Sequence, residues 1–180
     1  MRRFRSTIGF SAILLALSLV TAGSVNAQNT GSRSIEQQVR KTILSLPNYG
    51  VFDIIKYDVD GGRVTLTGKV YSLGTHSLAV RSARKISGVT EVIDNIENLP
   101  ASPFDDRIRR QALRTFHERG LGRYFWEINP DVRIIVDGGR LTLEGYVYNS
   151  GDRNALGIYA RGLSNVFEVT NNLIVGKAVY

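Results

Sequence analysis

The sequence predicts an α+β fold made of two small domains in tandem, each with the element order helix, strand, strand, helix, strand (αββαβ). Segments 60–71 and 137–148 read DGGRVTLTGKVY and DGGRLTLEGYVY, so one unit is written twice. Apolar and polar residues alternate on both sides of each Gly-Gly pair, which indicates β-hairpins, and apolar residues at helical spacing flank each hairpin. We expect each domain to be a three-stranded mixed sheet with two helices on one face.

The repeat is longer than the hairpin. Residues 60–98 align with 137–175 without a gap, and the identical pairs include Asp60/Asp137, Leu66/Leu143, Gly68/Gly145, Val70/Val147, Ala83/Ala160, Val92/Val169 and Asn95/Asn172. Between the copies, Pro100 and Pro103 in NLPASPFDD discourage regular structure. We therefore predict domains at 28–100 and 101–180.

Residues 1–27 have the features of a secretory signal peptide. A basic start (Arg2, Arg3, Arg5) precedes the apolar run 8–20, and small residues at Val25 and Ala27 suit cleavage before Gln28. A membrane-anchoring helix is the weaker alternative, because the apolar run is short and small polar residues follow it.

Charge and cysteine content narrow the possible functions. Removing residues 1–27 takes away three arginines and no acid, so the net charge falls from +7 to +4. No basic arm or charge run remains, which argues against nucleic-acid binding. The absence of cysteine excludes disulfides and leaves no acceptor for a lipid anchor at the cleavage site. We expect an exported, soluble protein.

The first helix of the first copy is predicted to start at Ser34, which forms a capping box with Gln37. Apolar residues follow at helical spacing, and Pro47 and Gly50 end the helix. The second copy should have an equivalent helix after Pro103.

The Gly-Gly pairs predict type I′ turns, in which both central residues need positive φ: Gly61 and Gly62 in one copy, Gly138 and Gly139 in the other. Gly68 and Gly145 fall on the apolar face of the following strand. We interpret them as sites where a helix approaches the sheet closely.

A second helix is expected at about 75–87, with Ala79, Ala83 and Ile86 on its apolar stripe. Its copy has Asp152 as the predicted N-cap and an equivalent stripe of Leu156, Ala160 and Leu163. The last strands, at about 91–99 and 168–175, follow a helix and should pair parallel with the strand before it.

These motifs resemble the BON domain family, whose members carry a V-x-L-x-G-x-V strand, a helix and a G-V-x-x-V-x-N segment. The first copy matches with Val64, Leu66, Gly68 and Val70, and then with Gly88, Val89, Val92 and Asn95. The second copy departs at Asn165, where the family has Gly, but Asn tolerates the left-handed region. It also has a longer stretch, by roughly eight residues, between its first helix and first strand.

The resemblance implies a function. Two such domains behind a signal peptide resemble osmotically induced periplasmic proteins and outer-membrane lipoproteins of this family. Such proteins are associated with phospholipid binding and envelope integrity, not with catalysis. Within this resemblance, the absence of an anchor cysteine implies that the chain is similar to the soluble periplasmic branch.

Residues that could carry chemistry are sparse. The two histidines, His76 and His117, lie at non-equivalent places, and no cluster with metal-ligand spacing surrounds either. Neither copy has a phosphate-binding loop, and Asp58 and Asp60 fit a solvated turn. We therefore predict no catalytic residue, no metal and no cofactor.

The segment RIRRQALRTFHERGLGRYFWEINP is where the copies differ most. Its apolar stripe is Ile108, Ala112 and Phe116, with arginines to either side and RYFW after it. One interpretation is that the stripe is core and the aromatic residues fill the junction between the domains. The other is that arginine and aromatic side chains bind an anionic lipid surface. The predicted lipid-binding residues are Arg109, Arg110, Arg114, Arg123, Tyr124, Phe125 and Trp126.

Our leading hypothesis is a non-enzymatic envelope protein that binds phospholipid peripherally. A periplasmic adaptor or chaperone-like protein, acting on envelope proteins through exposed sheet edges, is the alternative. An uncharacterised hydrolase is a third hypothesis, and it would need a pocket with convergent polar groups.

Overall fold

The computed structural model describes residues 24–126 and 128–176 and contains the predicted element order twice. The first unit consists of α1 (Ser24–Leu44), β1 (Ile54–Asp60), β2 (Arg63–Val70), α2 (Leu73–Ala83) and β3 (Glu91–Asn98). The second consists of α3 (Pro103–Glu118), the short 3-10 helix η1 (Gly122–Tyr124), β4 (Val132–Asp137), β5 (Arg140–Val147), α4 (Ser150–Arg161) and β6 (Glu168–Val175). The αββαβ order is confirmed in both units, and η1 is an addition in the second.

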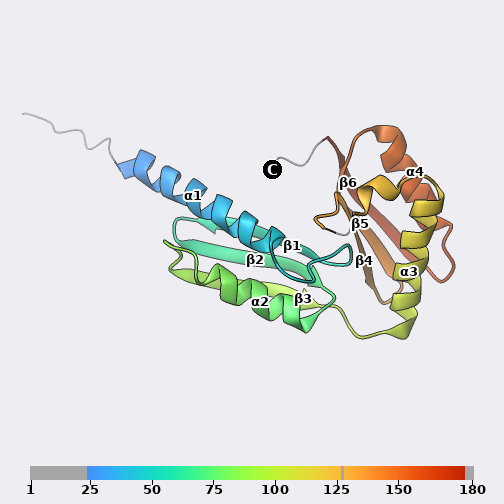
Figure 1. Cartoon of the computed structure of the whole chain (residues 1–180), viewed down its shortest axis with the longest axis horizontal. Coiled ribbons are helices and arrows are strands. Elements are labelled where there is room, and N and C mark those ends of the chain that lie inside the picture. Colours follow the sequence, from blue (N-terminus) through green and yellow to red (C-terminus); the bar gives the residue numbers. More distant parts are fainter. Residues whose placement is uncertain (1–23, 127, 177–180) are drawn as a thin grey trace, which may run out of the picture.

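Each unit has the predicted mixed sheet. The strand orders are β1-β2-β3 and β4-β5-β6, with the first pair antiparallel and the second pair parallel in each sheet. In the second unit, α3 and α4 lie on the side of the sheet away from the first unit (Figure 1). In the first unit α1 contacts β1 and α2, and α2 contacts β2 and β3. Two helices therefore cover one face of each sheet, as predicted, and among the described residues no helix covers the other face.

Each unit has its own hydrophobic core, formed where the helices pack on the sheet. The first core contains Val39, Leu66 and Ala83, and the second contains Phe116, Leu143 and Ala160. The predicted helical stripes and strand alternations thus point inward in both copies. The interpretation that Ile108, Ala112 and Phe116 form a core stripe is confirmed, since all three are buried.

The predicted start of the first helix is wrong. The helix α1 begins at Ser24, so Ser34 and Gln37 lie inside it and do not cap it. The ten residues before Ser34 contain one glycine and no proline, so no residue there stops the helix. Of the predicted signal peptide, only 24–27 lie within the described residues, where they form the first turn of α1.

The other helix starts also differ from the prediction. Ser72 caps α2, because its side chain accepts a hydrogen bond from the Gly74 N–H. Asn149, not Asp152, caps α4, and it accepts from the Asp152 N–H. Asp152 sits three residues into the motif, where it is free to bind other side chains.

The two hairpins use their glycines differently. Gly138 and Gly139 both have positive φ, as a type I′ turn requires, but in the first hairpin only Gly61 does, so the prediction for Gly62 is wrong. The Gly62 carbonyl accepts from the Thr90 N–H at 2.8 Å, which ties the turn to the segment before β3. Asn165 has φ of 67°, in the left-handed region like its counterpart Gly88, as the sequence predicted.

Gly68 and Gly145 are required by the neighbouring strand, not by a helix. A Cβ at either position would lie 2.1 Å from a backbone carbonyl oxygen, that of Ile54 or Asp131, and φ is +129° and +117°. The interpretation of close helix approach is therefore wrong. The absence of a side chain at this glycine leaves room for the Ile54 carbonyl of β1, or the Asp131 carbonyl before β4, to approach the central strand closely.

The connection between first helix and first strand is longer in the second unit, but by less than expected. It spans nine residues in the first unit (45–53) and thirteen in the second (119–131), a difference of four rather than eight. The extra residues include η1.

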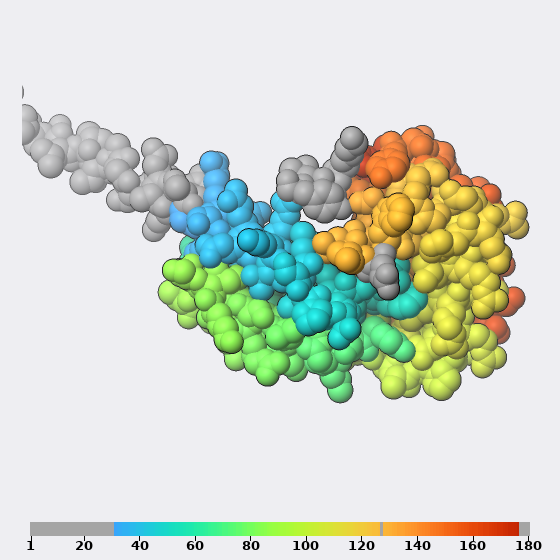
Figure 2. Space-filling model, in the orientation of Figure 1, coloured from blue at the N-terminus to red at the C-terminus, as the bar shows by residue number. Residues whose placement is uncertain are grey.

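The units contact one another through residues 49–53 of the first unit, which we call the docking loop. The Ile134 N–H of β4 donates to the Val51 carbonyl at 2.7 Å, and Val51 and Phe52 pack against the second core. Because β4 is an edge strand, this contact covers part of an edge that would otherwise be open. Figure 2 shows the two units in contact.

Arg133 of β4 anchors the docking loop. It is only 6% exposed, its Nη1 donates to the Gly50 carbonyl at 2.6 Å, and its guanidinium lies 4.1 Å from the centre of the Tyr49 ring. Asp53 holds the other end of the loop, because its carboxylate accepts from the Gly50 and Tyr71 N–H groups. Burial raises the pKa of Asp53, although these two hydrogen bonds oppose the shift.

Replacing Gly68 by Ala should destabilise the first unit by about 3 kcal/mol or more, because the new methyl group meets a backbone carbonyl that cannot move without breaking the sheet. Gly61→Ala is the matched control: its φ is +60° but a Cβ there meets nothing within 4 Å. It should cost only about 1–2 kcal/mol. Urea unfolding measures both, and equal losses would contradict the carbonyl contact as the cause.

Arg133→Ala should uncouple the two units, because it removes both the cation over Tyr49 and the donor to the docking loop. We expect a loss of about 2–3 kcal/mol in unfolding free energy and a calorimetric transition that broadens or splits. Arg140→Ala, at an exposed arginine of β5, should leave the transition unchanged. A single unshifted transition in Arg133→Ala would show that this side chain does not couple the units.

Candidate functional site

The predicted lipid-binding residues do not form one surface. Three of the seven are buried, with exposed fractions of 1% for Arg109, 0% for Tyr124 and 6% for Phe125. A buried side chain does not reach a headgroup, so these three are removed from the candidate site. The other four, at positions 110, 114, 123 and 126, are exposed to different degrees.

Arg109 is an internal contact between the two units. Its guanidinium donates to the Val136 carbonyl and to the Asp106 carboxylate, and it lies 4.7 Å from the centre of the Tyr71 ring of the first unit. Arg109 is next to Ile108 of the core stripe on α3. Its side chain reaches the first unit, where it meets the Tyr71 ring. Sequence spacing placed it off the stripe, but the docked first unit buries it.

The aromatic residues of RYFW complete the second core. Phe125 stacks on Phe116 with ring centres 5.2 Å apart, and Tyr124 packs against Tyr148 at 5.1 Å. The Tyr124 hydroxyl donates to Asp152 and accepts from the Tyr148 N–H. Burial and the hydrogen bond to Asp152 raise the pKa of Tyr124. Tyr124 and Phe125 thus fill the second unit's own core, not the junction between the units.

Arg123 braces η1 instead of facing solvent with an unpaired charge. Its Nη2 lies 2.6 Å from Asp152, and its Nη1 donates to the Gly120 carbonyl at 3.0 Å. Burial alone would raise the pKa of Asp152, but the hydrogen bonds from Tyr124 and Arg123 outweigh it and hold this pKa below its usual value. The positive charge of Arg123 is therefore balanced by the Asp152 carboxylate.

Arg110 and Arg114 are exposed cations, as a lipid-binding role requires. Both are exposed on α3, and Arg107 lies on the same side one turn earlier. Within the described part of the chain, none of the three forms an ion pair or a cation–π contact. We call Arg107, Arg110 and Arg114 the arginine face. Figure 2 shows α3, in yellow, on the surface of the second unit.

An apolar pair lies at the N-terminal end of this helix, and sequence reasoning missed it. Phe104 and Phe167 stack with ring centres 5.9 Å apart, and they are 36% and 77% exposed. A Cβ on Gly139 would lie 2.5 Å from Phe167, so the glycine makes room for the pair. Phe167 aligns with Thr90 of the first copy. This replacement of a small polar residue by an aromatic one was the signal in the sequence that could have indicated the apolar pair.

Asp105 fixes the helix end that carries this pair. Its carboxylate is 1% exposed and accepts from the Gly138 and Gly139 N–H groups at 3.0 and 2.8 Å. The β4–β5 turn is thereby held under the first turn of α3. The hydrogen bonds of Asp105 consequently hold in place the helix end that carries both the arginine face and Phe104 of the apolar pair.

Trp126, the one tryptophan of the chain, remains accessible. It is 65% exposed and follows the anchored Phe125 directly. Its neighbour Ile128 is 79% exposed. An exposed aromatic residue on an anchored segment is suited to an interface between water and lipid.

Other candidate chemistry finds no support in the described residues. No group of three or more His, Asp or Glu side chains there could hold a metal ion. His76 is engaged with Asp94 and Asn98, and the His117 ring contacts the Leu113 carbonyl. None of the described helices is both long and apolar enough to cross a membrane.

Comparison with solved structures finds CdsD, a structural protein of the type III secretion system of Chlamydia trachomatis. Its C-terminal domain has 11% identity and a TM-score of 0.32, covering 78% of this chain and 96% of that chain. A second CdsD structure has 12% identity and a TM-score of 0.33, covering 81% and 94%. TM-scores this low carry no functional argument. A search of curated protein sequences returned no match.

The family comparison is decisive. A model of the BON domain matches residues 32–100 and again residues 105–177, which together span most of the chain. The tandem αββαβ units are the expected architecture for two such domains. BON domains are generally non-catalytic binding domains of envelope-associated proteins. The chain therefore belongs to the BON domain family and carries two BON domains in tandem.

Proposed function

We propose that this protein is a non-enzymatic cell-envelope protein whose second BON domain binds anionic phospholipid surfaces peripherally. The observation that carries the proposal is the arginine face: Arg107, Arg110 and Arg114 are exposed on one side of α3. Anionic lipid headgroups attract such cations, and each one near the surface contributes about 1 kcal/mol.

The absence of internal partners makes these arginines effective. An arginine already paired with a carboxylate, as Arg123 is with Asp152, would have to break that ion pair to bind a phosphate. No such cost applies to Arg110 and Arg114 among the described residues. The buried stripes Ile35, Val39, Ile43 and Ile108, Ala112, Phe116 align α1 with α3. At the positions of Arg107, Arg110 and Arg114 the first unit then has Ser34, Gln37 and Lys41, so only one cation of the row recurs there.

Apolar side chains supply the second component of membrane binding. Phe104 and Phe167 lie beside the N-terminal end of the arginine face, and burying an aromatic ring in the interface is worth about 2 kcal/mol. Trp126 supplies a further interfacial contact. Combined apolar and cationic contacts give reversible peripheral attachment.

Location and role complete the proposal. Export by the predicted signal peptide, residues 1–27, would bring the protein to the periplasm, where anionic phospholipids face it. Binding there would support envelope integrity or tolerance of osmotic stress, the roles that the family resemblance implies.

Arg110→Ala with Arg114→Ala should weaken binding to vesicles of phosphatidylglycerol and cardiolipin about 30-fold, because two contacts of about 1 kcal/mol each are lost. Co-sedimentation at low salt measures the affinity. Wild-type binding should also fall steeply as salt is added. The intrinsic fluorescence of Trp126 gives a second readout, with a blue shift on binding.

The matched control is Arg81→Ala with Arg84→Ala, which removes the same charge from exposed positions of the first domain. It should bind nearly as wild type does. Equal loss in both double variants would mean that only net charge matters. No binding by the wild-type protein at low salt would refute the proposal.

A protein-interaction role is the second candidate, and the free edge of the second sheet favours it. On β6, Ile174 and Val175 are 56% and 48% exposed, whereas the equivalent edge strand β3 carries Glu97 and Asn98 there. An uncharged edge is able to pair with an extended segment of another protein. Ile174→Lys should then abolish recovery of a stoichiometric partner from envelope extract and leave vesicle binding intact. Recovery of that partner by Ile174→Lys would contradict this role.

A further inference from the structure

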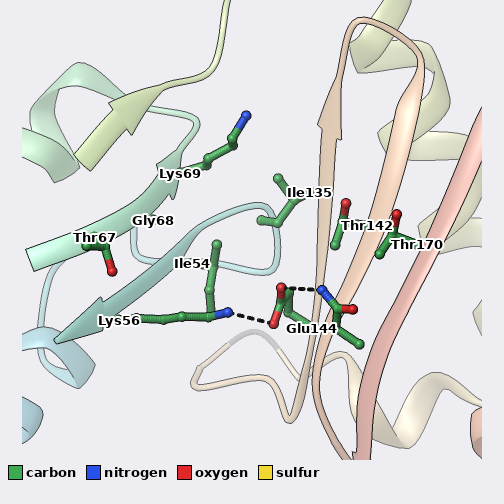
Figure 3. A pocket seen from close by; sticks show the side chains of 10 residues that line it. Ile54, Lys56, Thr67, Gly68, Lys69, Ile135, Thr142, Glu144 and Thr170 are labelled. Atoms are coloured by element: carbon green, nitrogen blue, oxygen red, sulfur yellow. Dashed lines mark hydrogen bonds and ion pairs between the residues drawn. The ribbon is translucent and has the colours of Figure 1, made fainter. Parts of the chain in front are cut away.

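A cleft lies between the two domains, where the helix-free faces of the two sheets meet. Its volume is about 410 Å³. The first domain contributes side chains from β1 and β2, and the second contributes side chains from all three of its strands (Figure 3). Because the docking loop orients the domains, this cleft belongs to the tandem and to neither domain alone.

Two ion pairs across the cleft hold its walls together. The Lys56 Nζ lies 3.0 Å from the Glu144 carboxylate, and the Lys69 Nζ lies 2.6 Å from Asp137. Figure 3 shows Lys56 extending from the first sheet toward Glu144 on the second. These ion pairs therefore link the first sheet to the second at the cleft.

The charges of the cleft are already balanced. One Glu144 oxygen accepts from Lys56 and the other from the amide of Asn172, while Lys69 is also paired with Glu97. An anion would have to displace Glu144 from Lys56, and a cation would have to displace Lys56 from Glu144. The cleft therefore favours a ligand with no net charge.

Unused hydroxyl groups line the same cleft. Thr67, Thr142 and Thr170 project into it, and their hydroxyls make no hydrogen bond within the described residues. Thr142 and Thr170 are register partners on neighbouring strands, so their hydroxyls lie side by side. Each hydroxyl both donates and accepts, which matches ligands that do the same. Ile54 and Ile135 lie between these groups and supply apolar contact.

An aromatic residue extends the surface beyond the cleft. Along β5, Thr142, Glu144 and Tyr146 alternate onto the helix-free face, and Tyr146 pairs in register with Ile174 of β6. Tyr146 is half-buried. Hydroxyl, amide and carboxylate groups followed by a tyrosine ring form a row that suits a sugar, whose hydroxyls bond to polar groups and whose C–H face packs on a ring.

We infer that this interdomain cleft binds a neutral oligosaccharide, with one sugar between the sheets and the next against Tyr146. The volume of the cleft accommodates a ligand of about one or two rings. The inference does not rest on membrane binding, because the arginine face and the cleft share no residue. An envelope protein with both would connect a lipid surface to a glycan.

The test is titration of the ¹⁵N-labelled full chain with maltose and with N,N′-diacetylchitobiose, followed by amide NMR. We expect one of these sugars, at millimolar concentration, to shift the amides of Gly68, Thr142 and Thr170 in a saturable way. Thr142→Val with Thr170→Val replaces two hydroxyls by methyl groups of similar shape and should weaken binding about tenfold or more. Vesicle binding should be unchanged in this variant.

Thr65→Val is the matched control, because Thr65 lies on the same face of β2 but outside the cleft. It should bind sugar as wild type does. No saturable shift at the cleft with either sugar would overturn the inference. So would equal binding by the double valine variant with a well-dispersed spectrum, or stronger shifts with trialanine or inorganic phosphate than with the sugars.

Discussion

The buried contact between Arg133 and the docking loop determines how the two BON domains are arranged. An arginine that is 6% exposed must satisfy its donors inside the protein, and here the Gly50 carbonyl and the Tyr49 ring do so. The Tyr49 hydroxyl in turn accepts from the N–H of Ile55, the second residue of β1. The first strand of one domain and the first strand of the other are thereby joined. The interdomain cleft and the contact of Arg109 with Tyr71 lie between the domains that this joint connects.

The two copies use one position in different ways. In the first domain the Tyr71 N–H donates to Asp53 and the Tyr71 ring lies under Arg109 of the second domain. In the second domain the equivalent Tyr148 N–H donates to Tyr124, whose ring covers that of Tyr148. Tyr148 is thus contacted by Tyr124 of η1, within its own domain, whereas the equivalent Tyr71 is contacted by Arg109 of the neighbouring domain.

The same docking separates two surfaces of different chemistry. The helices of the second domain lie away from the first domain, so the unpaired arginines of α3 face solvent. The helix-free sheet faces lie toward each other, and there the charges pair across the cleft and leave hydroxyls unused. An anionic surface suits the first arrangement and a neutral polar ligand suits the second. Physical chemistry therefore assigns the two proposed activities to opposite sides of the second sheet.

Local patterns in the sequence were sufficient for the fold. The hairpins, the apolar stripes and the parallel last strands follow from spacing alone, because period-2 and period-3.6 patterns depend only on neighbours along the chain. The positive φ of Asn165 could also be predicted, since it depends on backbone sterics. The start of α1 could not, because helix ends depend on the residues that follow and precede over several turns.

The candidate site depended on tertiary structure. Arg109 and Arg110 are adjacent in sequence, yet one is buried by the neighbouring domain and the other is exposed. Arg123 has the same chemistry as Arg114, but Asp152, far along the chain, neutralises it. Gly68 is required by a carbonyl on the neighbouring strand that its own segment does not reveal. The sequence by itself determined the tandem αββαβ units and their elements, because those depend on local spacing. Only the tertiary structure decided which charges are unpaired and where the domains leave a cleft, because burial and pairing depend on residues distant in the chain.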